Sequence, residues 1–378
     1  MVLTEEQLLI QETARKFVRN QVAPYSAEWE RRAAFRPGLF AELGALGLMG
    51  MTVPTEWGGS GADHVAYSLA LQEIAAGDGA LATVVSGHNS VGVMPILSYG
   101  SEPQKQRYVR DLATGRKLSA FCLTEPQGGS DAAAIKTSAR RKGEHYLLSG
   151  VKQFITSGAT ADIALVIAVT NPDAGKRGIS AFIVDTKAPG YRVTRIEKKM
   201  GQNASDTCEI AFDEVKVPVA DRLGEEGQGY RIALANLEGG RIGIASQSVG
   251  MARAALDIAV KYAHERRAFG KTIFEHQAVS FRLADMAASL EAARQLTLHA
   301  AALKDAGQPC LVEASMAKLV ASETAERVCS DAIQTLGGAG YMQEFEVERI
   351  YRGVRGAKIY EGTNDIQRLV ISRSLGGA

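Results

Sequence analysis

The spacing of apolar and polar residues changes twice along the chain. Up to about residue 118, apolar residues recur at the intervals of helices that pack along one face. From there to about residue 223, short apolar runs are separated by turn residues, as in strands. Helical spacing then returns until the chain ends. The pattern predicts three domains, with residues 1–118 helical, 119–223 built of strands and 224–378 helical, and it indicates an α+β protein.

The first domain carries clear helix-start signals. Thr4 and Gln7 form a capping box before its first predicted helix. Ser101 caps its last one, with Pro103 in the first turn, where a missing N–H costs nothing. The predicted helices cover residues 5–20, 37–46, 64–76 and 103–112.

The middle domain is predicted from short β-like runs. Lys142-Gly143 is typical of a hairpin turn, and the unbroken apolar run 164–169 indicates a strand buried on both faces. We expect the strands to form a compact antiparallel barrel or sandwich. They cover residues 119–123, 137–141, 145–152, 163–169, 180–185, 192–196 and 208–217.

The last domain is predicted to contain long helices over residues 230–266, 277–306, 311–336 and 366–375. These segments are rich in alanine, which suits close packing of helices in a bundle.

Composition narrows the class of protein without indicating a reaction. The 378 residues are 46% hydrophobic and 22% charged, with a formal net charge of +1 and no block of one sign. This balance argues against nucleic acid or a membrane surface as partner. The chain opens with a capped helix rather than an export or transit peptide, and we expect no segment long and apolar enough to span a bilayer.

Cysteines and histidines do not indicate a metal site. The four cysteines are far apart, and the six histidines form no ligand pair. We expect buried free thiols in a reducing compartment.

Candidate chemistry gathers in residues 358–368. Glu361 follows an isoleucine and a tyrosine and precedes Gly362. Asn364 with Gln367 is typical of a capping box, so Glu361 would lie just before a helix N-terminus, where free N–H groups hold an anion or a polarised oxygen. Apolar surroundings would raise its pKa toward that of a general base. A solvated loop acid before a capped helix is the alternative, and this segment alone does not decide.

Five segments together resemble the acyl-CoA dehydrogenases, flavoenzymes that desaturate acyl-CoA thioesters. The segments are residues 123–131, 154–158, 265–277, 334–341 and 358–368. Each alone would be weak, but they follow the family order over nearly the whole chain. The resemblance implies an N-terminal helical domain, a central β-domain and a C-terminal four-helix bundle, with FAD between the last two.

The resemblance also implies roles at the cofactor, which is needed because no side chain accepts a hydride. Thr124 would bond the pyrimidine side of the flavin, Thr156 would lie near the hydride-accepting nitrogen, and Phe154 would cover the ring. A plain strand end is the alternative for residues 154–156. Further implied cofactor positions are Leu123, Ser130, Arg266, Phe269, Gln277, Gln334, Gly337, Gly338, Thr363 and Asp365.

Arg266 implies an oligomer. The matching arginine of the family pairs with the FAD pyrophosphate of a neighbouring subunit, so a homotetramer, a dimer of dimers, is expected. A solvated helix face is the alternative for Arg266 and Arg267. The glycine run 337–340 is not a dinucleotide fingerprint, since it follows a helix and lacks the third glycine.

The resemblance makes Glu361 the base that takes the Cα proton. A minority of the family place the base immediately before an arginine on the long helix, but here Gly240 precedes Arg241. The thioester carbonyl would accept hydrogen bonds from the Glu361 backbone N–H and a flavin ribityl hydroxyl. Implied substrate positions are Ser130, Glu238, Arg241, Tyr360 and Gly362. Glu238 is also typical of a solvated helix acid.

The remaining expectations follow from the resemblance too. An electron-transfer flavoprotein would reoxidise the flavin, in a bacterial cytoplasm or a mitochondrial matrix. Ser86, Gly87 and Ser90 on the helix that matches the pocket floor restrict little, and the run 240–246 looks most like short-chain members, so we expect a short or medium acyl-CoA. The alternatives are an oxygen-using enzyme of acyl-CoA oxidase type and, less favoured, a non-catalytic or nucleic-acid-binding relative.

Overall fold

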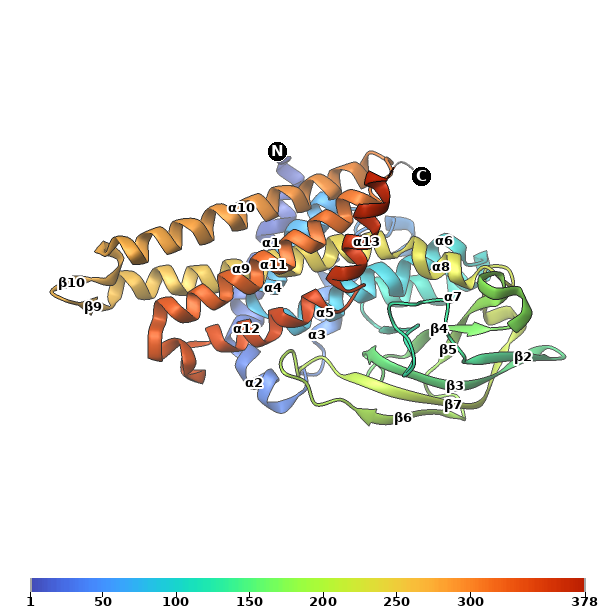
Figure 1. Cartoon of the computed structure of the whole chain (residues 1–378). Helices are drawn as coiled ribbons and strands as arrows, with labels where there is room; N and C mark the ends of the chain where they lie inside the picture. The colour runs from blue at the N-terminus through green and yellow to red at the C-terminus, as the bar shows by residue number, and fades with distance from the viewer. Residues whose placement is uncertain (1, 377–378) are drawn as a thin grey trace.

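Helices from the two ends of the chain pack together, and a β-sheet formed by the middle of the chain lies against one end of them (Figure 1). The computed structural model describes residues 2–376. The helical, strand and helical segments follow in the expected order. The exact division at residues 118 and 223 stays a prediction.

The N-terminal segment confirms the helix-start signals. Thr4 and Ser101 both form capping boxes, with Gln7 and Gln104 as partners. The α-helices here are α1 (Glu5–Gln21), α2 (Ser26–Arg32), α3 (Leu39–Ala45), α4 (His64–Gly77), α5 (Gly79–Gly87), α6 (Met94–Tyr99) and α7 (Glu102–Ala113).

One helical stretch departs from expectation. A π-helical segment, His88–Val93, joins α5 to α6, and π-segments are often found at functional sites. The combined stretch Gly79–Tyr99 has a mean hydropathy of 1.3 and is long and apolar enough to span a membrane. The expectation that no segment meets this test was therefore wrong. Because 78% of the apolar window is buried inside the fold, the stretch is weak evidence for a span and is what a core helix looks like.

The middle segment forms one sheet with the order β6-β7-β3-β2-β4-β5-β8, and β1 pairs with β4. Most neighbours are antiparallel, but β1–β4 and β2–β4 are parallel, so the sheet is mixed rather than purely antiparallel. The strands are β1 (Ser119–Cys122), β2 (Ser138–Lys142), β3 (His145–Thr156), β4 (Ile163–Val169), β5 (Ile179–Asp185), β6 (Tyr191–Ile196), β7 (Thr207–Pro218) and β8 (Arg222–Leu223).

The C-terminal segment contains long helices that lie side by side (Figure 1). The predicted helix 230–266 is interrupted at Asn236, whose backbone (φ −96, ψ −5) and side-chain bond to the Ile232 carbonyl depart from a continuous helix. The elements are α8 (Gly229–Ala235), α9 (Leu237–Glu265), β9 (Arg267–Ala268), β10 (Lys271–Thr272), α10 (Gln277–Asp305), α11 (Leu311–Leu336), α12 (Val347–Val354) and α13 (Asn364–Leu375).

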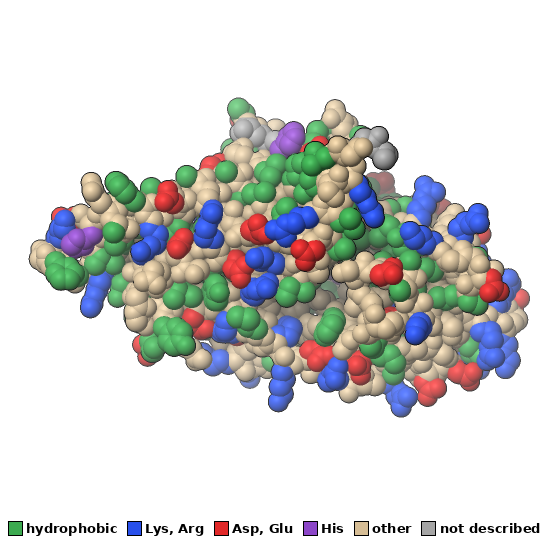
Figure 2. Space-filling model, in the orientation of Figure 1, with side chains coloured by type: hydrophobic (Ala, Val, Ile, Leu, Met, Phe, Trp, Pro, Cys, Tyr) green, Lys and Arg blue, Asp and Glu red, His purple; other side chains and the backbone are tan. Residues whose placement is uncertain are grey.

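The core runs through both helical segments and one face of the sheet. The four cysteines are free and buried, as predicted. Phe269 nevertheless remains 96% exposed at the tip formed by β9 and β10, and Figure 2 shows apolar, basic and histidine side chains interspersed at this end.

Candidate active site

Glu361 lies on a tight turn between α12 and α13. Its φ is 53°, and that of Gly362 is 82°, so two consecutive residues adopt the left-handed conformation. Non-glycine residues rarely do so, and such conformations cluster at functional sites. Among the described residues, nothing accepts a hydrogen bond from the Glu361 backbone N–H. The turn therefore presents a free donor beside the carboxyl group.

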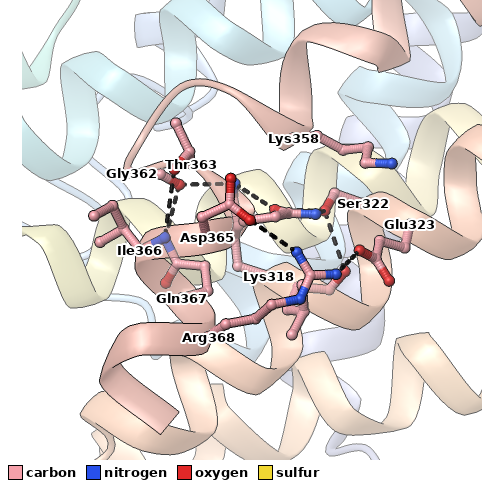
Figure 3. Close-up of polar contacts among 12 residues, drawn as sticks. Lys318, Ser322, Glu323, Lys358, Gly362, Thr363, Asp365, Ile366, Gln367 and Arg368 are labelled. Carbon is pink, nitrogen blue, oxygen red and sulfur yellow. Dashed lines mark hydrogen bonds and ion pairs between the residues drawn. The ribbon is translucent and has the colours of Figure 1, made fainter. Parts of the chain in front are cut away.

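The predicted capping box at this turn is wrong. The cap of α13 is Thr363, whose hydroxyl accepts from the Ile366 N–H at 3.4 Å. Asn364 is turned inward and bonds Ser322 on α11. Gln367 donates to the Gly362 carbonyl at 2.8 Å (Figure 3). Asn364 and Gln367 therefore hold the turn through their side-chain hydrogen bonds, and they do not cap α13.

Glu361 is partly buried, and its carboxyl group has no hydrogen-bond partner among residues 2–376. Burial raises its pKa to about 7, although the charges of Arg241 and Lys318 oppose the rise. A Cβ atom at Gly240 would lie 2.8 Å from the Glu361 Oε2 atom. Any residue other than glycine at position 240 would therefore displace this carboxyl group. Glu361 is therefore a partly buried acid with a pKa near neutral pH.

Arg241 lies behind the same carboxyl group. It is 5% exposed, and its Nη1 donates to the Ser315 hydroxyl at 3.1 Å. Its Nε is buried and has no partner among the described residues. Glu238, in the first turn of α9, is half-buried, and its Oε2 lies 3.6 Å from the Nζ of Lys304 on α10. Glu238 is thus held by an ion pair and is not a freely solvated acid.

The Tyr360 hydroxyl is committed to other side chains. It accepts from Gln202 at 3.0 Å and donates to Gln247 at 2.9 Å. The Thr83 hydroxyl bonds both amide side chains. It donates to the Gln202 Oε1 at 2.5 Å and accepts from the Gln247 Nε2 at 2.6 Å. This cluster links three parts of the fold to Tyr360, the residue that precedes Glu361. The three parts are helix α5, helix α9 and the loop that precedes β7. No local sequence pattern indicates this cluster, because its members are far apart along the chain.

Two of the predicted cofactor segments meet at the sheet. The Gln153 N–H donates to the Thr124 carbonyl at 2.9 Å, next to Phe154 at the end of β3. Buried Lys152 donates to the Leu123 carbonyl and pairs with buried Glu125 at 2.8 Å. This ion pair holds the segment after β1 against β3.

Polar and aromatic groups at this sheet end are free to meet a ligand. The hydroxyls of Thr124, Ser130 and Thr156 make no hydrogen bond to any described residue. Phe154 lies two residues before the end of β3, has φ 59° and is 60% exposed. An exposed ring beside unpaired hydroxyls fits a flat ligand with a polar edge, such as a flavin ring.

A second group of predicted cofactor residues lies at the opposite end of the long helices. Arg266 follows the last residue of α9, which has 29 residues and is about 43 Å long at roughly 1.5 Å per residue. The exposed members of this group are Arg266, Phe269, Gln277, Gln334, Gly337 and Gly338. An added Cβ at Gly337 or Gly338 would meet no atom within 4 Å. Within one copy of the chain, this group therefore lies far from the predicted cofactor residues at the sheet end.

The two remaining predicted cofactor positions lie beside Glu361. Thr363 caps α13, and Asp365 is exposed and pairs with Arg368 at 3.3 Å (Figure 3).

A cavity of about 200 Å³ opens beside α9. Tyr67, whose hydroxyl has a pKa raised by burial and by the nearby charge of Glu361, is one of its walls. Ser90 and Met94 from the π-helical segment and the start of α6 also line it, with Gly239. Within residues 2–376, no group of three or more His, Cys, Asp or Glu could hold a metal ion.

Comparison with known proteins gives a consistent result. Family models of the acyl-CoA dehydrogenases match the chain at residues 4–116 (N-terminal domain), 120–215 (middle domain) and 227–376 (C-terminal domain). An acyl-CoA dehydrogenase of Bacillus subtilis is 48% identical over 377 residues, which cover 100% of both chains. The caffeyl-CoA reductase-Etf complex subunit CarC of Acetobacterium woodii is 42% identical over 99% of both.

A solved structure agrees with the sequence matches. The butyryl-CoA dehydrogenase of Megasphaera elsdenii superposes with a TM-score of 0.97, at 41% identity over 99% of both chains. The three-part fold and the order of the five sequence segments fit these matches over the full length. The chain therefore belongs to the acyl-CoA dehydrogenases, a family of flavoprotein oxidoreductases.

Proposed function

We propose that this chain removes hydrogen across the Cα–Cβ bond of a short acyl-CoA thioester and yields the trans-2-enoyl-CoA, with Glu361 as the base and FAD as the cofactor. The observation that carries the proposal is the Glu361 carboxyl group, which is partly buried and unpaired and whose pKa burial raises to about 7. A general base works best when its pKa lies near the working pH.

The backbone of the same turn supplies the second catalytic element. The free Glu361 N–H would donate to the thioester carbonyl of the substrate, which stabilises the negative charge that develops there when Cα loses its proton. Because base and donor belong to one residue, the left-handed turn fixes both relative to the same substrate.

The sheet end fits the cofactor. When bound, FAD supplies the acceptor for the hydride that leaves Cβ. Phe154 would cover the flavin ring, and the unpaired hydroxyls of Thr124 and Thr156 would meet its polar edge. Ser130 and Leu123 would border the same ligand. Thr363 and Asp365 are the proposed contacts on the C-terminal side, with Asp365 the weaker candidate because it already pairs with Arg368.

The far group of cofactor residues supports a homo-oligomer. Arg266 and Phe269 lie beyond the end of a helix about 43 Å long, away from the sheet end of their own chain. A second copy would bring them, with Gln277, Gln334 and the 337–338 backbone, to the FAD of its partner. A phenylalanine that is 96% exposed is also expected to be covered in an assembly. We propose a tetramer built as a dimer of dimers.

The cavity beside α9 supports a short acyl chain. Its volume of about 200 Å³ is small, and Tyr67 and Met94 narrow it. A Cβ at Gly243 would collide with the Ser86 and Tyr67 hydroxyls, so the Tyr67 side chain, which lines the cavity, is tightly packed at its hydroxyl. The butyryl-CoA named for the Megasphaera relative is consistent with this size. Glu238, Arg241, Tyr360 and Gly362 are the proposed substrate-side residues.

An electron-transfer flavoprotein is the proposed electron acceptor. The support is the Acetobacterium relative, whose name places it in a complex with such a protein. We further propose a bacterial cytoplasm, or a mitochondrial matrix in a eukaryote, since four buried free thiols suit a reducing compartment.

Anaerobic titration of the purified protein with butyryl-, octanoyl- and palmitoyl-CoA tests the proposal through the visible spectrum of its flavin. We expect a yellow protein that bleaches most completely with butyryl-CoA and recovers with electron-transfer flavoprotein. Rapid recovery with oxygen alone would favour the oxidase alternative. A colourless protein that FAD cannot restore would contradict the proposal.

A further inference from the structure

We propose that Lys318 is a positioning residue for the base. It fixes the backbone turn that carries Glu361 and places a buried positive charge beside the Glu361 carboxyl group. The inference deepens the proposed function and rests on Glu361 being its base.

Lys318 is unusual for its burial. It lies on α11, on the helix face that also carries the buried residues Ala314, Ala321 and Ser322, and its side chain is 0% exposed. Lysine is almost never fully buried unless its ammonium group is paired. No carboxylate lies within ion-pair distance of Lys318 among the described residues. A structural ion pair therefore does not explain why Lys318 is buried.

The partners of Lys318 belong to the base turn. Its Nζ donates to the Gly362 carbonyl at 2.9 Å and to Asn364 Oδ1 at 2.9 Å (Figure 3). Gln367 donates to the same Gly362 carbonyl, at 2.8 Å. Gly362 immediately follows Glu361 and is held at φ 82°. Two buried donors thus fix the carbonyl of a left-handed residue, which sets the direction of the preceding N–H and carboxyl group.

The charge of Lys318 acts on the same group. The charged or titratable groups that face the Glu361 carboxyl are Arg241 from α9, Lys318 from α11, Tyr67 from α4 and the adjacent Tyr360. Of these, the two cations lower the Glu361 pKa against the effect of burial. Burial lowers the pKa of Lys318 itself to about 8, and Glu361 partly restores it. Removing the Lys318 charge should therefore make Glu361 harder to ionise.

Infrared difference titration measures this directly. The C=O band of the protonated Glu361 carboxyl is assigned by its loss in Glu361→Gln, and its midpoint is followed from pH 5 to 9 in the purified protein without substrate. We expect a midpoint near 7 in the unmodified protein and a rise of about one unit in Lys318→Met. Lys318→Arg keeps the charge and should leave the midpoint at or below that of the unmodified protein.

A second variant keeps the proposal testable if Lys318→Met does not fold. Asn364→Asp sets a carboxylate beside the ammonium group, in the first turn of α13 where an acid is tolerated, and should also raise the Glu361 midpoint. Lys358→Met is the matched control. Lys358 lies three residues before Glu361, but its Nζ pairs with Glu326 at 2.7 Å, and in Figure 3 it points away from Lys318.

Unchanged midpoints in Lys318→Met and Asn364→Asp would overturn the proposal, as would an equal shift in Lys358→Met. A rise confined to the first two supports it. The pH dependence of flavin bleaching by butyryl-CoA gives a second measurement, and its midpoint should move with the infrared one. If the unmodified protein does not bleach, the proposed function has failed, and the infrared titration still decides the role of Lys318.

Discussion

Replacing Glu361 with glutamine should stabilise the protein, and the gain should grow with pH. The folded structure raises the pKa of this carboxyl from an ordinary value of 4.5 to about 7. The unfolded chain therefore gives up the proton at lower pH than the folded chain does. The ionised acid costs folding free energy that is absent well below pH 4.5, increases as the pH rises, and reaches its full size above pH 7.

The magnitude follows from the size of the shift. A difference of about 2.5 pKa units at about 1.36 kcal/mol per unit makes the cost about 3 kcal/mol at pH 8 and close to zero at pH 4. Glutamine has nearly the same shape and no charge, so Glu361→Gln should recover most of this free energy at pH 8.

Thermal unfolding monitored between pH 4 and 8.5 measures the effect. The midpoint of Glu361→Gln should equal that of the unmodified protein near pH 4 and exceed it by several degrees at pH 8. Glu56→Gln, at an exposed side chain, is the control and should show no such divergence. A constant difference between the two curves at every pH would refute the raised pKa and, with it, the account of Glu361 as a base poised near neutrality.

Three other substitutions probe the site. Gly240→Ala places a Cβ 2.8 Å from the Glu361 carboxyl and should slow flavin bleaching by butyryl-CoA at least tenfold without loss of FAD, whereas an unchanged rate would show that this carboxyl is free to move. Arg266→Ala should weaken FAD retention and leave the fold intact by circular dichroism; retention at the original affinity would separate Arg266 from the cofactor. Lys152→Met strands the buried charge of Glu125 and should cost about 3–5 kcal/mol in chemical unfolding, while a cost below 1 kcal/mol would contradict an ion pair that organises this loop.

Local sequence patterns predicted the fold wherever one segment decides its own structure. The helix starts at Thr4 and Ser101 lie where their capping boxes indicated. The strand pattern likewise predicted β1 to β7 of the sheet, but not the two-residue strand β8. Pairing is a different problem, because β1 lies parallel to β4 through contacts between separate segments that no local pattern contains. The mixed sheet was therefore missed.

The same difference between local patterns and contacts of separate segments applies to the candidate active site. Glu361 is predicted as the base because its neighbours in the sequence mark it, both by type and by family resemblance. The cap was misassigned because Asn364 prefers a partner 46 residues away, Lys318, to the backbone of its own helix. Lys318 escaped notice since a lysine within a helix is ordinarily a surface residue. A signal existed in its spacing, four residues from Ala314 and four from Ser322 on the buried face of α11.

The most direct test of the central claim is single-turnover flavin reduction by butyryl-CoA in the unmodified protein and in Glu361→Gln, followed anaerobically by stopped-flow absorbance. Loss of a general base typically costs about 10²–10⁴-fold. We predict that Glu361→Gln keeps FAD and binds butyryl-CoA but reduces its flavin at least about a hundredfold more slowly. Flavin reduction by that variant at the rate of the unmodified protein would show that another group removes the proton.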